Sequence, residues 1–274
     1  MTLPARSVGA LTVSAIGLGC MNLSHAYGVP PSDADGIALL NRALDLGVTL
    51  LDTAALYGLG ANERLVGKAV MHRRAEFTLA SKCVLDAVDG KRVLDGRPES
   101  IRRTLEGALE RLGTDHIDLY YLHRLDKKVP VEESVGELAR LRTEGKIRHV
   151  GVSNFSVDEL QRVRRIVPIV SVQNRYNVGD RGSEDVLALC TREGIAFIPW
   201  APIASGSAEK LVSDGLEAVA KQHGVSVFQV ALAWLLAKSP VMLPIPGTSS
   251  VAHLEDNVGA AGLELSAQDL ARLG

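Results

Sequence analysis

IDLYYLHRLDKKVPVEESVGELARLRTEGKIRHVGVS, residues 117–153, indicates the architecture of the chain most clearly. An apolar run at 117–123 is followed by a helix-like pattern at 130–145 and by a second apolar run at 147–153. Continuous apolar runs are typical of strands that are buried on both faces of a parallel sheet. The stretch therefore predicts two parallel strands joined by a helix.

The same alternation extends along almost the whole chain. We expect further strands within residues 14–20, 48–54, 77–82, 169–177, 195–201 and 241–247. We expect further helices within residues 33–47, 62–74, 98–113, 157–167, 182–194, 213–224, 225–239 and 251–262. About eight strand–helix units close a (β/α)8 TIM barrel, an α/β fold of typically ~250 residues.

The rival architecture is a doubly wound open sheet, which normally carries a glycine-rich phosphate loop after an early strand. GLGCMN at 17–22 lacks the third glycine of that fingerprint, so we interpret it as a turn at the mouth of the first barrel strand. Residues 1–15 predict a short N-terminal hairpin that plugs the lower end of the barrel. No linker or low-complexity stretch divides the chain, so we expect one domain, 1–274.

Composition excludes several classes of function. The net charge of −2 gives no electrostatic reason for binding nucleic acid or a membrane surface. Three widely spaced cysteines predict buried thiols in a reducing compartment rather than disulfides or a metal site. The N-terminus has no signal-peptide pattern, and the apolar run 225–237 is shorter than the ~20 residues that cross a bilayer. We expect a cytoplasmic protein.

Four polar side chains lie where predicted strands end. Asp52 and Tyr57 stand in LLDTAALYG, Lys82 closes FTLASK, and His123 closes IDLYYLH. Parallel α/β barrels present their chemistry at the carboxyl ends of the strands. A carboxylate, a phenol, an amine and an imidazole can together move one proton onto an oxygen, with Lys82 lowering the pKa of the phenol.

Three motifs in order and spacing resemble the aldo-keto reductase family. They are LLDTAALYGLGANERLVGKAV, the central segment 112–155, and LPIPGTSSVAHLEDN at 243–257. The resemblance implies a (β/α)8 barrel that transfers hydride between NADPH and a carbonyl. Carried over by position, it implies that Tyr57 is the general acid, that Lys82 and Asp52 form the pair beside it, and that His123 orients the carbonyl.

The resemblance also implies a set of cofactor contacts. Ser153, Asn154 and Gln173 match positions that bind the nicotinamide carboxamide, and Trp200 matches the aromatic residue that stacks on its ring. The other tryptophan, Trp234, we expect in a helix core. The full set of expected cofactor contacts is Gly19, Met21, Asp52, Ser153, Asn154, Gln173, Trp200, Pro202, Gly247, Thr248, Ser249, His253 and Asn257.

Two positions depart from the family pattern. Many members carry Lys and Arg where this chain has Gly247 and His253. The resemblance makes NADP(H) the expected cofactor. Because the departure weakens the expected hold on the 2′-phosphate, we keep NAD(H) as the alternative. The backbone and hydroxyl groups of 247–250, ahead of a helix, can still bind phosphate.

The substrate is expected to be a small aldehyde or ketone, with aromatic or pyridoxal-type aldehydes worth testing. The expected substrate contacts are Met21, His25, Tyr27, Leu56 and His123, with Leu59 as a further pocket candidate. Two alternatives remain open: a nucleotide-binding, non-catalytic member that serves as a channel auxiliary subunit, and a barrel hydrolase or isomerase that uses no nicotinamide. We expect a monomer without a metal ion.

Overall fold

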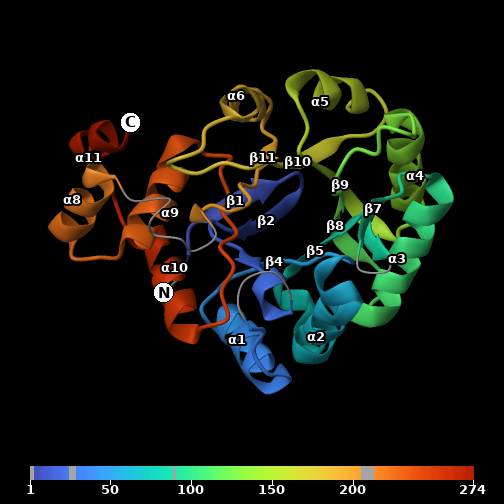
Figure 1. Cartoon of the computed structure of the whole chain (residues 1–274), viewed down its shortest axis with the longest axis horizontal. Helices are drawn as coiled ribbons and strands as arrows, with labels where there is room; N and C mark the ends of the chain where they lie inside the picture. Colours follow the sequence, from blue (N-terminus) through green and yellow to red (C-terminus); the bar gives the residue numbers. More distant parts are fainter. Residues whose placement is uncertain (1–2, 25–28, 89–90, 205–212) are drawn as a thin grey trace.

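The computed structural model describes residues 3–24, 29–88, 91–204 and 213–274. Across these residues, seven parallel strands form a curled sheet in which neighbours pair in chain order (Figure 1). They are β3 (Leu18–Gly19), β4 (Leu50–Asp52), β5 (Thr78–Cys83), β8 (Ile117–Leu122), β9 (Ile147–Ser153), β10 (Ile169–Gln173) and β11 (Ala196–Phe197).

The eighth position of the barrel is filled by residues 241–247, which bridge the two edge strands. The Leu243 N–H donates to the Phe197 carbonyl at 2.9 Å, and the Gly17 N–H donates to the Pro244 carbonyl at 3.0 Å. Pro244 and Pro246 have no N–H groups, so this segment cannot form a regular ladder. The predicted eighth strand is therefore an irregular closing segment, and the predicted (β/α)8 barrel is confirmed.

Helices surround the sheet in Figure 1 and cover its outer face. The α-helices are α1 (Asp33–Asp45), α2 (Ala61–Val70), α3 (Pro98–Leu112), α4 (Val131–Thr143), α5 (Val157–Val163), α6 (Glu184–Glu193), α8 (Asp214–His223), α9 (Val227–Lys238), α10 (Val251–Gly259) and α11 (Ala267–Leu273). Short 3-10 helices lie at η1 (Met21–Leu23), η2 (Tyr57–Gly60), η3 (Met71–Glu76) and η5 (Ala260–Gly262). Trp234 is buried in α9 and stacks on Tyr176, as expected of a core residue.

Two antiparallel hairpins lie outside the barrel sheet. β1 (Ala5–Val8) pairs with β2 (Leu11–Ser14), and Val8 and Val13 pack in one apolar cluster with barrel residues such as Leu50 and Leu119. This hairpin crosses the centre of Figure 1, which confirms the predicted plug. The second hairpin, β6 (Leu85–Val88) with β7 (Lys91–Leu94), follows β5 where the sequence had indicated only a loop.

Candidate active site

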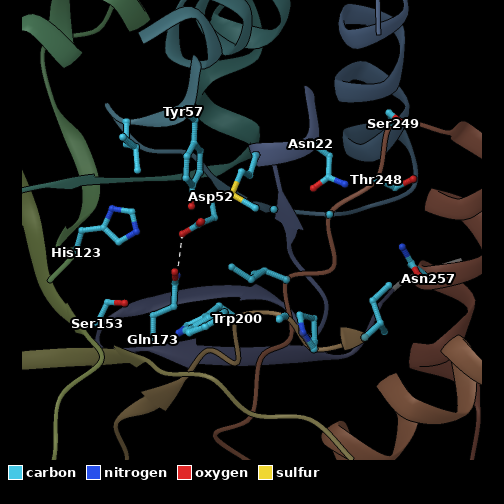
Figure 2. A pocket seen from close by; sticks show the side chains of 18 of the residues that line it. Asn22, Asp52, Tyr57, His123, Ser153, Gln173, Trp200, Thr248, Ser249 and Asn257 are labelled. Atoms are coloured by element: carbon cyan, nitrogen blue, oxygen red, sulfur yellow. Dashed lines mark hydrogen bonds between the residues drawn. The ribbon is translucent and has the colours of Figure 1, made fainter. Parts of the chain in front are cut away.

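Asp52, Tyr57, Lys82 and His123 converge at the carboxyl ends of adjacent strands. Asp52 ends β4, Lys82 is the last residue but one of β5, and His123 directly follows β8. Tyr57 begins η2, which residues 53–56 connect to β4, and the left-handed backbone of Gly58 and Gly60 then turns the chain into α2. Figure 2 shows Tyr57 and His123 facing the same space, with Asp52 beside them.

Lys82 links the acid to the phenol. Its Nζ atom forms an ion pair with Asp52 Oδ1 and donates to the Thr53 carbonyl at 2.9 Å and to Tyr57 Oη at 3.2 Å. The side chain is completely buried. Burial lowers the pKa of Lys82, but the Asp52 carboxylate and the Tyr57 phenol more than offset this, so the net direction is upward. Lys82 is therefore charged at neutral pH.

The direction of the Tyr57 shift differs from the sequence-based expectation. Burial raises the pKa of the Tyr57 phenol, and the Lys82 ammonium opposes that rise without cancelling it. The expectation counted the ammonium but not the desolvation of a phenol that is 8% exposed. Tyr57 is thus protonated at neutral pH, which is the state that a proton donor to a carbonyl oxygen requires.

His123 is held as a neutral imidazole. Burial, together with the charges of Lys82, Arg124 and Arg92, lowers the pKa of His123 well below its usual value. Its Nδ1 atom is buried and has no hydrogen-bond partner among the described residues. The ring lies edge-on to Tyr57, with 6.2 Å between the ring centroids. A neutral imidazole that faces a cavity can hydrogen-bond a carbonyl oxygen without competing for the proton.

An amide-rich group lies across the site from Tyr57. Gln173 Nε2 donates to Asp52 Oδ2 at 2.9 Å, the contact drawn in Figure 2. Trp200 Nε1 donates to Asn154 Oδ1 at 3.0 Å, and Asn154 Nδ2 donates to Ser153 Oγ at 2.7 Å. Asn154 has the left-handed φ of +61°, which asparagine tolerates better than most residues. Asn154 thereby fixes Ser153 and Trp200 relative to each other.

Most of these residues line a cavity of about 460 Å³. Figure 2 shows its two ends, with Tyr57 and His123 at one and Thr248, Ser249 and Asn257 at the other. The expected site residues that line it are Gly19, Met21, Asp52, Leu56, Tyr57, His123, Ser153, Gln173, Trp200, Pro202, Gly247, Thr248, Ser249, His253 and Asn257.

Other expected residues lie elsewhere. Lys82 lies buried behind Tyr57 and Asp52, and Asn154 lies behind Trp200, so neither side chain lines the cavity. Leu59 is 62% exposed and does not line it either, which makes the expectation for this residue wrong. His25 and Tyr27 lie outside the described residues.

Several lining residues were not identified from the sequence. They are Asn22, Leu85, Arg92, Arg124, Ala201, Ile203, Phe228, Ile245 and Asp256. Leu85 and Arg92 belong to the hairpin β6–β7, for which the Asp–Gly pair at 89–90 between two short runs was an available sequence signal. Arg124 directly follows His123, so its place after a barrel strand was also a signal.

The cavity fits a dinucleotide at both ends. At one end, Ser153 and Gln173 offer polar groups to a flat amide, next to the indole of Trp200. At the other, Thr248 and Ser249 precede α10, whose N-terminal N–H groups favour an anion such as phosphate. The donors therefore match the chemistry of nicotinamide and of phosphate.

Metal and thiol chemistry find no support in the described ranges. No group of three or more His, Cys, Asp or Glu side chains there is placed to hold a metal ion. Burial raises the pKa of Cys20, Cys83 and Cys190 to about 12, so these thiols stay protonated. Of the helices that the structure describes, none has the length and apolar character needed to cross a membrane.

Comparisons with known proteins agree with this geometry. Residues 15–274 match the aldo/keto reductase family. An uncharacterised oxidoreductase of Schizosaccharomyces pombe is 40% identical over 268 residues, covering 97% of this chain and 87% of the relative. A thermostable aldo-keto reductase solved with the inhibitor epalrestat has a TM-score of 0.86 at 32% identity, covering 99% and 98% of the two chains. An aldo/keto reductase of Klebsiella pneumoniae, solved with NADP and acetate, has a TM-score of 0.85 at 29% identity, covering 100% and 94%.

Proposed function

The chain belongs to the aldo/keto reductase family, and from this premise we propose that it reduces the carbonyl of a small aldehyde or ketone with NADPH, using Tyr57 as proton donor. It is an NAD(P)H-dependent oxidoreductase, and its family acts on small carbonyl compounds. The observation that carries the proposal is the buried contact of Lys82 with both Asp52 and Tyr57 at the cavity.

Each catalytic side chain has one task in this proposal. His123 donates a hydrogen bond to the carbonyl oxygen and holds it near Tyr57 Oη. Tyr57 transfers its proton to that oxygen as negative charge develops there. The Lys82 ammonium, 3.2 Å from Tyr57 Oη, stabilises the phenolate that remains, and Asp52 keeps Lys82 charged in the dry site.

The cofactor contacts follow from the fit of the cavity. NADPH, when bound, supplies the hydride that reaches the carbonyl carbon. Ser153 and Gln173 would hold the carboxamide, and Trp200 would support the nicotinamide ring. Thr248, Ser249, His253 and Asn257 would hold the phosphate and adenine end. The NADP bound in the Klebsiella pneumoniae relative supports NADP(H) over NAD(H) for this chain.

A panel assay tests the proposal. NADPH and NADH oxidation are followed at 340 nm with aromatic, aliphatic and pyridoxal-type aldehydes and with simple ketones. We expect faster oxidation of NADPH, dependent on the carbonyl compound. Absence of carbonyl-dependent oxidation with both cofactors, despite measurable NADPH binding, would instead favour the non-catalytic alternative. A single domain over 1–274, a monomer and a cytoplasmic location stay predictions, and size-exclusion chromatography tests the second.

A further inference from the structure

Two arginines line the catalytic end of the cavity and have no role in the proposed proton transfer. Arg124 directly follows His123, and Arg92 lies on strand β7 of the hairpin that follows β5. Both charges help to lower the pKa of His123. Arg92 also lowers the pKa of Arg124, alongside the larger effect of burial. Two cations therefore lie near each other and near the reacting atoms.

Neither arginine is paired with a carboxylate of the described ranges. Among the described residues, no Asp or Glu oxygen lies within 4.0 Å of a nitrogen of Arg92 or Arg124. The cavity lining includes two acids. Asp52 is paired with Lys82, and Asp256, near Asn257 at the other end, accepts a hydrogen bond from Ser226. Counted over the residues that the structure describes, the catalytic end thus carries more positive than negative charge.

Arg124 is positioned by hydrogen bonds that use only part of its guanidinium. Its Nη1 atom donates to the His123 carbonyl at 2.8 Å and to Ser153 Oγ at 3.3 Å. Its guanidinium lies 5.8 Å from the centre of the Trp200 ring. In the described part of the chain, all of its hydrogen bonds use Nη1, which leaves Nε and Nη2 free. Those two nitrogens form the fork that binds a carboxylate or phosphate through parallel hydrogen bonds.

We propose that Arg124, assisted by Arg92, binds an anionic group on the substrate, so that the preferred substrates are carbonyl compounds that also carry a carboxylate or a phosphate. Leu56, Leu85 and Met21 line the same cavity and suit an apolar or aromatic spacer between the two groups. The anion binds at the arginines while the carbonyl reaches Tyr57 and His123. The exposed Arg92 adds attraction that salt screens, whereas the half-buried Arg124 forms the directed contact.

This inference rests on the proposed reduction, and a matched pair of aldehydes tests it. 4-Carboxybenzaldehyde and methyl 4-formylbenzoate share a ring and an aldehyde but differ in charge. We expect kcat/KM to be at least ~10-fold higher for the acid in the wild type, since hydrogen bonds to charged groups are strong. Arg124→Gln should bring the acid-to-ester ratio down to the factor of about three that the remaining Arg92 supplies. Arg92→Gln should lower it about threefold, with a weaker salt dependence than the wild type.

Two further arms identify the anion and control for general damage. Pyridoxal 5′-phosphate against pyridoxal gives the corresponding ratio for a phosphate. Arg97→Gln is the matched control, because Arg97 follows the same hairpin but is paired with Asp95 and does not line the cavity. It should leave both ratios unchanged. The dissociation constant for NADPH, measured on every variant, shows whether Arg124 instead binds the cofactor.

The outcomes separate this inference from the proposed reaction. Ratios near one in the wild type for both pairs, or ratios that Arg124→Gln does not change, would overturn the anion site. Failure to reduce any aldehyde would overturn the proposed reaction. In that case titration of the NADPH-loaded protein with benzoate and benzamide decides the anion site. Tighter binding of benzoate that is lost in Arg124→Gln supports the site, and equal binding overturns it.

Discussion

Gln173 Nε2 lies 2.9 Å from Asp52 Oδ2, so one hydrogen bond connects the amide-rich side of the cavity to the buried ion pair of Lys82. Asp52 thus has one oxygen on Lys82 and the other on Gln173. A buried carboxylate needs partners for both oxygens to remain charged in a dry environment. The proposed cofactor contact of Gln173 is therefore coupled to the charge state of the proposed proton relay.

Gln173→Leu should impair both binding and chemistry. Removing a hydrogen bond to a buried carboxylate costs about 1.5–3 kcal/mol, so kcat should fall ~10-fold or more while the dissociation constant for NADPH rises. Gln222→Leu is the matched control, because Gln222 donates to Asp269 at 3.2 Å far from the cavity. Steady-state kinetics and fluorescence titration measure both effects. A Gln173→Leu enzyme with normal kcat would show that Asp52 does not depend on this contact.

Trp200 should contribute to cofactor binding through its ring more than through its N–H group. Trp200→Ala removes both and should weaken NADPH binding by ~1–3 kcal/mol, the usual range for aromatic stacking on a base. Trp200→Phe keeps a ring but loses the hydrogen bond to Asn154, so its loss should be smaller. Calorimetric titration with NADPH ranks the three proteins. Equal affinity in wild type and Trp200→Ala would mean that the indole does not support the nicotinamide.

The buried His123 should make the protein less stable in acid. Its pKa in the folded state lies well below the usual value of about 6.5, so below pH 6.5 the unfolded chain takes up a proton that the folded chain does not. Above pH 6.5 the imidazole is neutral in both states and has no such effect; as pH falls below 6.5, the free energy of unfolding decreases by up to ~1.4 kcal/mol per pH unit. In urea unfolding at pH 7, 6 and 5, the free energy of unfolding should decrease less steeply with falling pH for His123→Gln than for the wild type. His72 is exposed, so His72→Gln is the control and should show the same pH dependence as the wild type. If His123→Gln also shows the wild-type pH dependence, burial of a neutral His123 is not the cause of the acid sensitivity.

His253 should influence the preference for NADPH through its position. It lies at the phosphate end of the cavity, on the first turn of α10. His253→Arg places a permanent charge and a forked donor there, so it should raise the ratio of NADH to NADPH dissociation constants. His253→Ala should lower that ratio, while the dissociation constant for NADH stays near the wild-type value in both variants. Fluorescence titration with the two cofactors measures the ratios, and equal ratios in all three proteins would show that His253 does not contact the 2′-phosphate.

Periodicity was enough to predict most of the barrel, but some local features were not recognised. Pro244 and Pro246 end the regular ladder at the eighth position, although the apolar pattern of 241–247 resembled the other strands. Helix α11 was not expected, although Ser266 and Asp269 form a capping box that was visible as a spacing of three. Both signals concern single backbone groups rather than a repeating pattern.

The site was predicted through its motifs, whereas its energetics depend on how deeply the fold buries each side chain. The positions of Tyr57 and Lys82 after neighbouring predicted strands indicate that the two side chains can meet. Only the observed burial shows that desolvation raises the pKa of Tyr57 by more than the Lys82 ammonium lowers it. In the same way, the position of Asn154 in the sequence does not show that its side-chain amide hydrogen-bonds both Trp200 and Ser153. The arginine pair was not expected because Arg92 and Arg124 are distant in sequence and meet only through the fold.

Tyr57→Phe tests the central claim most directly. The substitution keeps the ring and removes the proton that the proposed reduction requires. Tyr120→Phe is the matched control, since Tyr120 is also buried and its hydroxyl has no hydrogen-bond partner among the described residues. With an aromatic aldehyde, kcat for Tyr57→Phe should fall by at least ~100-fold while NADPH affinity and the activity of Tyr120→Phe stay near those of the wild type. Near-normal turnover by a folded, NADPH-binding Tyr57→Phe enzyme would contradict the account.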